Sequence, residues 1–226
     1  MEEQNKKRSL FYDDSTVAGN PGNIKMNALQ WAKMNLSTVV KGIVAIVVGY
    51  LMMMEIHWVF GIVLIGALLF NFWYWITASN RFKMGDVNLG KVVSVNPDRI
   101  AVITDMTKMI GFYPIIKIVE TKLVPMERQL NSFIPTVALY KDNPFDYPFW
   151  SEFNPTPLSY GTSDKFILQS RLNSFADEDY VELDRLLAQI GTIKPGTYKV
   201  DIEASDWKEY PDVIVGDLDT MKGPAE

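Results

Sequence analysis

The sequence has no cysteine and a single histidine, and these two shortages remove most familiar catalytic and metal sites. Without cysteine there is no disulfide, no thiolate metal site and no thiol nucleophile. The one histidine, His57, lies in the longest apolar run, which leaves none elsewhere for a Ser/His/Asp triad or a transition-metal site. Neither a dinucleotide fingerprint nor a P-loop pattern occurs. Carboxylate chemistry is the enzyme class that survives.

Six carboxylates fall in or near expected loops with aromatic neighbours, a setting compatible with sugar-type sites: Asp98, Asp105, Asp142, Asp146, Glu152 and Asp164. Asp98 and Asp164 are explained at once by a turn and a helix cap. The acidic run at 177–179 is explained by favourable charge at a helix N-terminus. We therefore expect no catalytic residue, no cofactor and no metal.

Basic and acidic residues are unevenly distributed along the 226 residues. Residues 1–84 hold eight Lys/Arg against five Asp/Glu, whereas 85–226 hold fourteen against twenty-two. An acidic domain repels phosphate backbones, so nucleic acid is not expected as a partner. The expected partners are the lipid bilayer and other membrane or cytoplasmic proteins, further copies of this chain included.

The apolar run from 36 to 77 contains only two charged side chains, Lys41 and Glu55. One helix over this length would measure about 60 Å, roughly twice the hydrocarbon core of a bilayer. Two spans, at about 36–54 and 58–77, fit instead. A charge at mid-bilayer costs about 3 kcal/mol, so we interpret Glu55 and His57 as polar residues of the turn and not as an intramembrane ion site.

The residues that flank the apolar run predict its orientation. Basic side chains precede the first span and follow the second, while the turn has none, so both termini are expected in the cytoplasm. Tryptophans are enriched at membrane interfaces. Four of them are therefore predicted as interfacial anchors: Trp31, Trp58, Trp73 and Trp75.

The remaining chain has the pattern of a water-soluble α+β domain. Alternating β-branched runs at 87–95 and 99–106, separated by a turn, predict a β-hairpin, and two further β-rich runs follow at 113–124 and 132–140. We expect a small β-sheet or partly closed barrel over about 86–141. Two helices and a short strand are expected to follow this sheet.

Local signals mark the ends of those helices. Ser163 or Asp164 can cap the first, Ser174 with Asp177 resembles a capping box for the second, and Gly191 ends it. The proline-rich stretch before these helices, at about 142–164, predicts an ordered irregular loop whose aromatic residues pack onto the sheet. The same aromatics form a candidate interaction loop: Phe145, Tyr147, Phe149, Trp150 and Phe153.

The predicted fold is thus a two-helix transmembrane hairpin followed by a cytoplasmic α+β domain. Its boundaries are a flexible tail at 1–22, a juxtamembrane amphipathic helix at 23–35, the hairpin at 36–80, the soluble domain at 85–200 and an acidic tail at 201–226. The acidic tail at 201–226 contains Trp and Val residues that are unusual for a purely solvating segment. Docking on its own domain or on another subunit is therefore expected.

Two blocks of the soluble domain carry a resemblance. GDVNLGKVVSVNPDRIAVITDMT (85–107) and PTVALYKDNPFDYPFWSEFNPTPLSYGTSD (135–164) are similar to a bacterial family known only as a domain of unknown function, over about 85–200. The resemblance leaves the hairpin outside it and indicates a bacterial protein, so that, together with the predicted hairpin, the inner membrane is the expected location. The resemblance implies no activity and no site residues.

These observations favour a non-enzymatic membrane-anchored scaffold or accessory subunit that presents a cytoplasmic domain for protein–protein interaction. An oligomeric small transporter or channel subunit, which would use Glu55, His57 and Asn71, is the alternative. Two spans cannot enclose a pathway, so that alternative requires several copies. A carboxylate-based enzyme or ligand binder is the third hypothesis.

Overall fold

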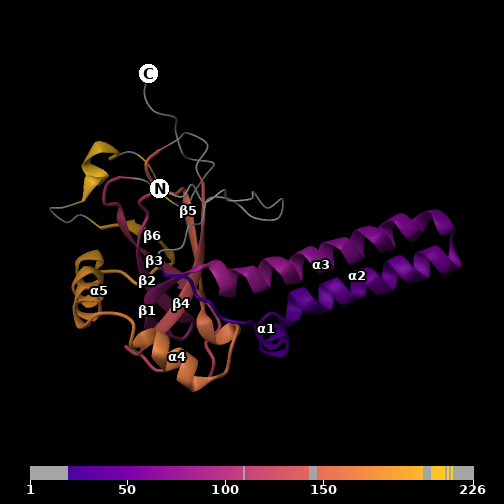
Figure 1. Cartoon of the computed structure of the whole chain (residues 1–226), viewed down its shortest axis with the longest axis horizontal. Coiled ribbons are helices and arrows are strands. Elements are labelled where there is room, and N and C mark those ends of the chain that lie inside the picture. Colours follow the sequence, from indigo (N-terminus) through magenta and orange to yellow (C-terminus); the bar gives the residue numbers. More distant parts are fainter. Residues whose placement is uncertain are drawn as a thin grey trace, which may run out of the picture.

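The computed structural model describes residues 20–108, 110–142, 147–200, 205–211, 213 and 215. Figure 1 shows a helical hairpin that projects away from a β-sheet domain carrying the remaining helices. The predicted flexible tail falls almost wholly at 1–19, outside the described residues.

Four elements make up the hairpin and its base: α1 (Ala28–Met34), α2 (Leu36–Glu55), the short 3₁₀ helix η1 (Trp58–Phe60) and α3 (Gly61–Met84). The predicted division into two helices with a turn near 55–57 is confirmed as a helix break. The amphipathic helix is shorter than predicted and begins at Ala28, where Asn27 caps it by accepting hydrogen bonds from two backbone N–H groups. α3 runs past the predicted end of the second span to Met84.

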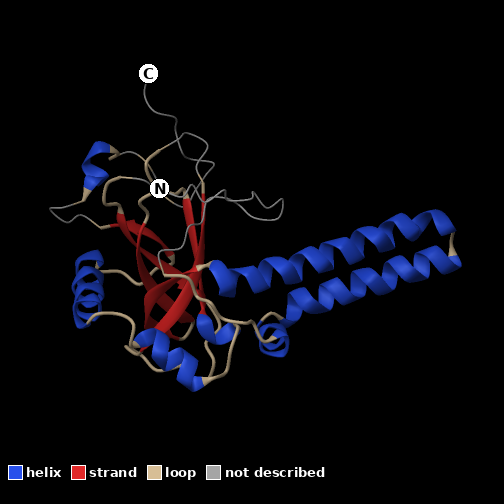
Figure 2. Cartoon of the chain, viewed as in Figure 1, coloured by secondary structure: helices blue, strands red, loops and turns tan. Residues whose placement is uncertain are grey.

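Among the described residues, six antiparallel strands form one sheet in the order β5-β4-β1-β2-β3-β6. Figure 2 shows the strands of this sheet in red. Their bounds are β1 Asp86–Val95, β2 Asp98–Asp105, β3 Pro114–Glu120, β4 Phe133–Lys141, β5 Glu152–Pro157 and β6 Gly196–Lys199. The predicted β1–β2 hairpin, both further β-rich runs and the late short strand are confirmed. Strand β5 lies within the stretch predicted to be irregular.

The position of β5 explains how it holds two prolines. It pairs only with β4 and is therefore an edge strand, where a residue without a backbone N–H is tolerated. Pro155 lies opposite Ala138 and Pro157 lies opposite Thr136. The irregular loop predicted over 142–164 is therefore corrected to a loop followed by an edge strand.

The sheet is curled, and each of its faces covers a separate core. The Lys117 ammonium of β3 donates to the Phe153 carbonyl of β5, so two strands that are not neighbours approach across the concave face. On the outer face, Leu183 and Leu186 of α5 (Asp177–Ile190) pack against Leu89 and other sheet residues.

The helix-end predictions are partly confirmed. Asp164 caps α4 (Lys165–Leu172), and Gly191 ends α5 with a left-handed φ of 63°. The capping box that started at Ser174 is wrong. Ala176 occupies the N-cap position of α5, its backbone N–H donates to the Asp179 carboxylate, and the Ser174 hydroxyl donates instead to the Arg171 carbonyl.

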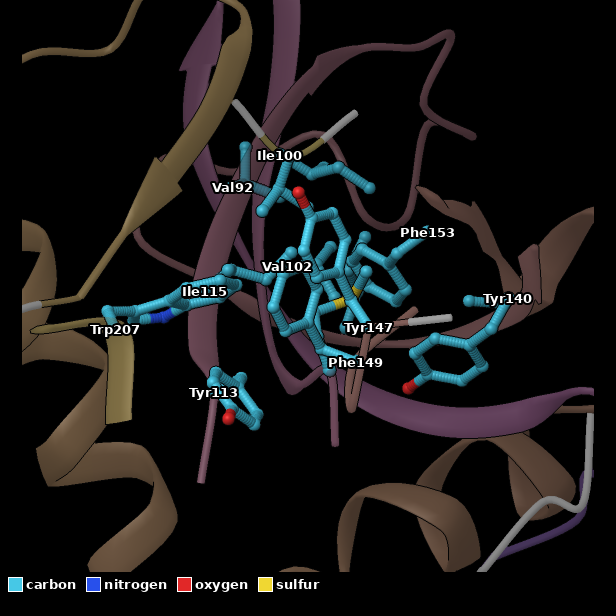
Figure 3. Packing of buried hydrophobic residues seen from close by; sticks show 14 of the residues in the cluster. Val92, Ile100, Val102, Tyr113, Ile115, Tyr140, Tyr147, Phe149, Phe153 and Trp207 are labelled. Carbon is cyan, nitrogen blue, oxygen red and sulfur yellow. The ribbon is translucent and has the colours of Figure 1, made fainter. Parts of the chain in front are cut away.

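The concave face is filled by aromatic residues (Figure 3), which include most of those predicted to form an interaction loop. Tyr147, Phe149 and Phe153 are buried, and Trp150 packs against the same core. Their predicted packing onto the sheet is confirmed. Their use as an interaction loop is corrected for the buried Tyr147, Phe149 and Phe153. It stays a prediction for the half-buried Trp150, and Phe145 lies outside the described residues.

The described part of the acidic tail docks on its own domain. Trp207, in the 3₁₀ helix η3 (Asp206–Glu209), is buried in the concave core, and its indole N–H donates to the Pro114 carbonyl at 2.8 Å. Val215 is buried in the same core. This segment therefore completes the domain that was predicted to end near residue 200.

Candidate functional site

The hairpin exposes an apolar surface that no other described element covers. Within the described residues, two helices are long and apolar enough to cross a membrane, Leu36–Glu55 and Trp58–Met84, and at most 6% of the most apolar stretch of either helix is buried. In a water-soluble domain, helices that are apolar all round are buried. An exposed apolar surface of this kind marks a membrane or protein interaction site.

Two glycines of α2 let the helices of the hairpin approach each other. A Cβ atom on Gly49 would lie 3.0 Å from the Leu64 Cα, and one on Gly42 would lie 2.3 Å from the Asn71 Oδ1. The Asn71 amide donates to the Ala67 carbonyl at 2.8 Å and to the Gly42 carbonyl at 3.3 Å. The single asparagine of the apolar run therefore has partners inside the hairpin and joins α3 to α2.

Replacing Gly49 with valine is expected to destabilise the hairpin. The added side chain meets backbone atoms of α3, which cannot rotate away, and overpacking of this kind costs about 1–3 kcal/mol. The free energy of unfolding of the detergent-solubilised protein measures the effect. Gly66→Val is the matched control, because a Cβ at Gly66 has no atom within 4 Å. Equal losses in the two variants would contradict the proposed contact.

The two polar residues predicted at the turn lie at the far tip of the hairpin. Glu55 is the last residue of α2, and His57 follows the helix break. The imidazole Nδ1 of His57 accepts a hydrogen bond from the Val59 backbone N–H at 3.2 Å, which starts the next helical turn. Both side chains are exposed. Their geometry is that of a turn.

The four predicted anchors occupy different environments. Trp58 is 75% exposed at the tip and Trp73 is 51% exposed on α3. Trp75 is partly buried against the core at the hairpin base. Trp31 is buried in that core, with 5% of its surface exposed, so its assignment as a lipid-facing anchor is corrected.

Trp31 is instead the centre of the junction between hairpin and sheet domain. Its ring meets Phe82 of α3 edge-on at 5.5 Å between centroids and Tyr160 at 6.3 Å. Its indole N–H donates to the Tyr74 hydroxyl at 2.9 Å. A Cβ on Gly161 would lie 2.5 Å from the Phe82 ring, which shows how closely the 3₁₀ helix η2 (Leu158–Tyr160) and its following residue approach α3.

Backbone hydrogen bonds also reinforce this junction. Gly22, Asn23 and Ile24 donate in turn to the carbonyls of Gly85, Lys83 and Phe82, at 2.9, 3.0 and 3.1 Å. α3 passes into β1 through Gly85 alone. The hairpin is thus joined to the sheet without a flexible linker.

Gly85 is required where helix becomes strand. A Cβ atom there would lie 2.4 Å from the Arg81 carbonyl oxygen and 2.8 Å from that of Ala138. Both contacts are shorter than real Cβ atoms allow, and both involve backbone. Any other residue would therefore move the end of α3 away from β4.

A buried carboxyl group lies beneath η2. Glu127 is 6% exposed, and its Oε2 accepts a hydrogen bond from the Ser159 hydroxyl at 2.7 Å, while Oε1 has no partner among the described residues. Burial raises the pKa of Glu127 to about 7. The Ser159 carbonyl in turn accepts from the Gln30 side chain of α1 at 3.0 Å. Glu127 thus supports the segment that holds α1.

A second polar group lies on the concave face, directly after the hairpin. The Tyr140 hydroxyl hydrogen-bonds Thr104, Asp86 and Asn88, and the Asn20 backbone N–H donates to Asp86. Burial raises the pKa of Asp86. The network joins β1, β2 and β4 to one another, and through Asp86 it also binds the segment that precedes α1.

The candidate carboxylates have structural partners. Asp98 accepts from the Arg128 guanidinium and the Leu123 backbone, and Asp105 accepts from the backbone of Thr107 and Tyr113. Asp142 pairs with Lys108, Glu152 accepts from Asn154, and Asp164 caps α4. Asp146 lies outside the described residues. Among the described residues, no group of three or more Asp, Glu or His side chains could hold a metal ion.

The sheet domain also presents an open apolar hollow on the side of α5 and β6. It has a volume of about 610 Å³ and is lined by residues of α5, β6 and the C-terminal segment, among them Leu186, Ile190, Tyr198 and Val213. Sequence patterns did not indicate this surface, because its residues come from three separate elements.

No family model matches the chain, and no curated protein matches it, so the resemblance to an uncharacterised bacterial family stays a prediction. One similar solved structure is described as "Crystal structure of a putative membrane protein from Corynebacterium diphtheriae". It is 16% identical, with a TM-score of 0.43, and the match covers 51% of this chain and all of that one. At this level of likeness, no property of that protein is transferred here.

Proposed function

We propose that this chain is a non-enzymatic membrane protein whose hairpin crosses the bilayer twice and holds a cytoplasmic α+β domain against the membrane surface. There it acts as a scaffold or accessory subunit for other proteins or further copies of itself. The observation that carries the proposal is the junction at Trp31 and Gly85, where the exposed apolar hairpin passes into the folded domain without a linker. A flexible tether would need no such junction.

The dimensions of the hairpin support the membrane assignment. At about 1.5 Å per residue, a helix of 20 residues spans about 30 Å, the hydrocarbon thickness of a typical bilayer. α2 has 20 residues and α3 has 24, so α3 is long enough to leave the bilayer before it joins the sheet. The tip carries no Lys or Arg and the base carries several, which supports cytoplasmic termini.

Two arrangements support a binding role over catalysis or transport. The described candidate carboxylates already have structural partners, as a helix cap, in ion pairs or in hydrogen bonds to the backbone and to Asn154. Glu55 and His57 lie at the tip, and the Asn71 amide is hydrogen-bonded within its own hairpin, so these residues outline no polar path. The hollow between α5 and β6 gives the domain an open apolar surface for a protein partner.

The absence of cysteine makes the topology directly testable. We expect a single cysteine at position 57 (His57→Cys) to react with a membrane-impermeant maleimide on intact cells from which any outer membrane has been removed. A single cysteine at position 208 (Lys208→Cys), on the exposed side of η3, should react only after lysis. Labelling of position 208 in intact cells would reject the orientation, and release of the protein by alkaline carbonate would reject the membrane assignment.

The scaffold role has its own test. Purified in mild detergent from its native membranes, the chain is expected to bring a protein partner or a second copy with it. Photo-crosslinkers at Ile190 and Val213, which line the hollow, should capture that partner, while one at the exposed Lys165 serves as the control. A chain that runs alone and captures nothing at any practical concentration contradicts this role.

A further inference from the structure

Basic side chains gather around the base of the hairpin without carboxylate partners. Among the described residues, no ion pair is formed by Lys33 of α1, Arg81 and Lys83 of α3, or Arg171 of α4. The five ion pairs formed between described residues belong to the strands, their loops and α5. Arg171 donates to the Gly22 carbonyl, while the four cations at the base have no carboxylate partner within the described part of the chain.

Arg81 differs from the others because the fold holds it in place. Its side chain is half-buried at the junction, where Nη1 donates to the Thr156 hydroxyl at 2.9 Å. Its Nε is buried and has no acceptor among the described residues. The buried Nε cannot reach an external ion, but Nη2 is not buried and has no acceptor among the described residues, so it can donate to a phosphate.

A second polar group lies on the same side of α3. Tyr74 and Arg81 are two helical turns apart, so both side chains leave α3 on one face. The Tyr74 hydroxyl accepts the Trp31 indole N–H at 2.9 Å, and no acceptor for its own O–H exists among the described residues. Tyr74 therefore places a hydrogen-bond donor on the same face as Arg81, nearer to the bilayer.

The depth of this pair indicates which anion. Arg81 follows the predicted end of the second span at 77 by about one helical turn, the level at which lipid headgroups meet a transmembrane helix. Toward the bilayer, exposed apolar side chains of α3 on this side line the path of an acyl chain, among them Phe70 at 60% and Trp73 at 51% exposure. An anion that carries an acyl tail fits both parts of this surface.

We infer that the base of the hairpin binds an anionic phospholipid, with its phosphate at Arg81 on the face of α3 that carries Tyr74, and with the exposed Lys33 and Lys83 attracting its charge. The inference rests on the proposed function, because it requires the hairpin to be in a bilayer. It adds a lipid class and a position to that function. The bound headgroup would fix the depth of the junction and thus the distance of the sheet domain from the membrane.

The test uses the full chain in a neutral detergent supplemented with phosphatidylglycerol, phosphatidylcholine or inorganic phosphate. For the wild type, phosphatidylglycerol is expected to raise Tm by about 5 °C over phosphatidylcholine. Arg81→Gln should abolish this difference and Arg81→Lys should keep only part of it. Lys194→Gln, an exposed cation in the loop between α5 and β6, is the control and should keep it in full.

Three results would overturn the inference: equal shifts with the two lipids, a full phosphatidylglycerol shift in Arg81→Gln, or the same shift with inorganic phosphate alone, which would indicate a free-anion site. If Arg81→Gln does not fold, the double variant Lys33→Gln/Lys83→Gln decides, since both side chains are exposed. It should halve the lipid difference, and an unchanged difference would count against the site. Carbonate extraction tests the membrane assignment separately, so failure of the lipid site is distinguishable from failure of the proposed function.

Discussion

Replacing Trp31 with alanine is expected to lower the free energy of unfolding by about 3–5 kcal/mol, the range for removing a large buried aromatic side chain. The indole fills the space between α1, α3 and η2, and it contacts Phe82 and Tyr160. Its removal also deletes the hydrogen bond to the Tyr74 hydroxyl. Because these contacts join the hairpin to the sheet, the loss should also free the domain to move relative to the hairpin.

Thermal unfolding in detergent measures the first effect, and the distance distribution between spin labels at the tip and on η3 measures the second. Trp73→Ala is the matched control, because Trp73 lies on α3 but is 51% exposed. In detergent it should change the stability little and leave the distance distribution narrow. A Trp31→Ala variant as stable and as rigid as Trp73→Ala would show that the junction does not depend on Trp31.

The hairpin and its turn could be predicted from composition alone. The apolar run at 36–77 has only two charged residues and is too long for one span, so it must fold back on itself. The polar residues near its middle, Glu55 and His57, mark the position of the turn. The sheet was predictable from its β-branched runs and the turns between them. Burial itself does not alternate on β1 and β2, because both faces of the sheet are covered there. In both cases the signal is local, because it depends on residues close together in the sequence.

Trp31 was misassigned because its partners are distant in sequence. A tryptophan that borders an apolar run has the same local pattern whether it faces headgroups or protein. Phe82 and Tyr160 decide between the two, and they lie 51 and 129 residues further along the chain. Glu127 was missed for the same reason, since nothing in its neighbourhood in the sequence indicates that Ser159 covers it.

For strand β5 and the aromatic loop the local signals were correct, but the conclusions drawn from them were wrong. Prolines at 155 and 157 argue against a central strand, and the strand they form is an edge. The aromatic residues of the loop were correctly expected to pack on the sheet, yet that packing covers the faces a partner would need. Burial is decided by the curl of the sheet, which no local pattern predicts.

Glu127→Gln is expected to stabilise the protein at alkaline pH and to remove part of its pH dependence. The folded chain raises the pKa of Glu127 to about 7 from an ordinary value of 4.5, because burial disfavours the charged form. Between these two pH values the folded state keeps a proton that the unfolded state has released, so stability falls as pH rises through this window and levels off above about 7. The difference between the folded and unfolded pKa values of Glu127 corresponds to a loss of about 3 kcal/mol in the free energy of unfolding across this window.

Glutamine is nearly isosteric with the neutral acid, and its carbonyl oxygen can still accept the Ser159 hydroxyl. The variant should therefore match the wild type near pH 5 and exceed its unfolding free energy by up to about 3 kcal/mol at pH 8. Unfolding at a series of pH values in one detergent measures both curves, and the exposed Glu178→Gln is the control. Parallel curves for wild type and Glu127→Gln would contradict the buried carboxyl. Divergent curves would link its ionisation to η2, which holds α1 through Gln30, and hence to the attachment of the hairpin.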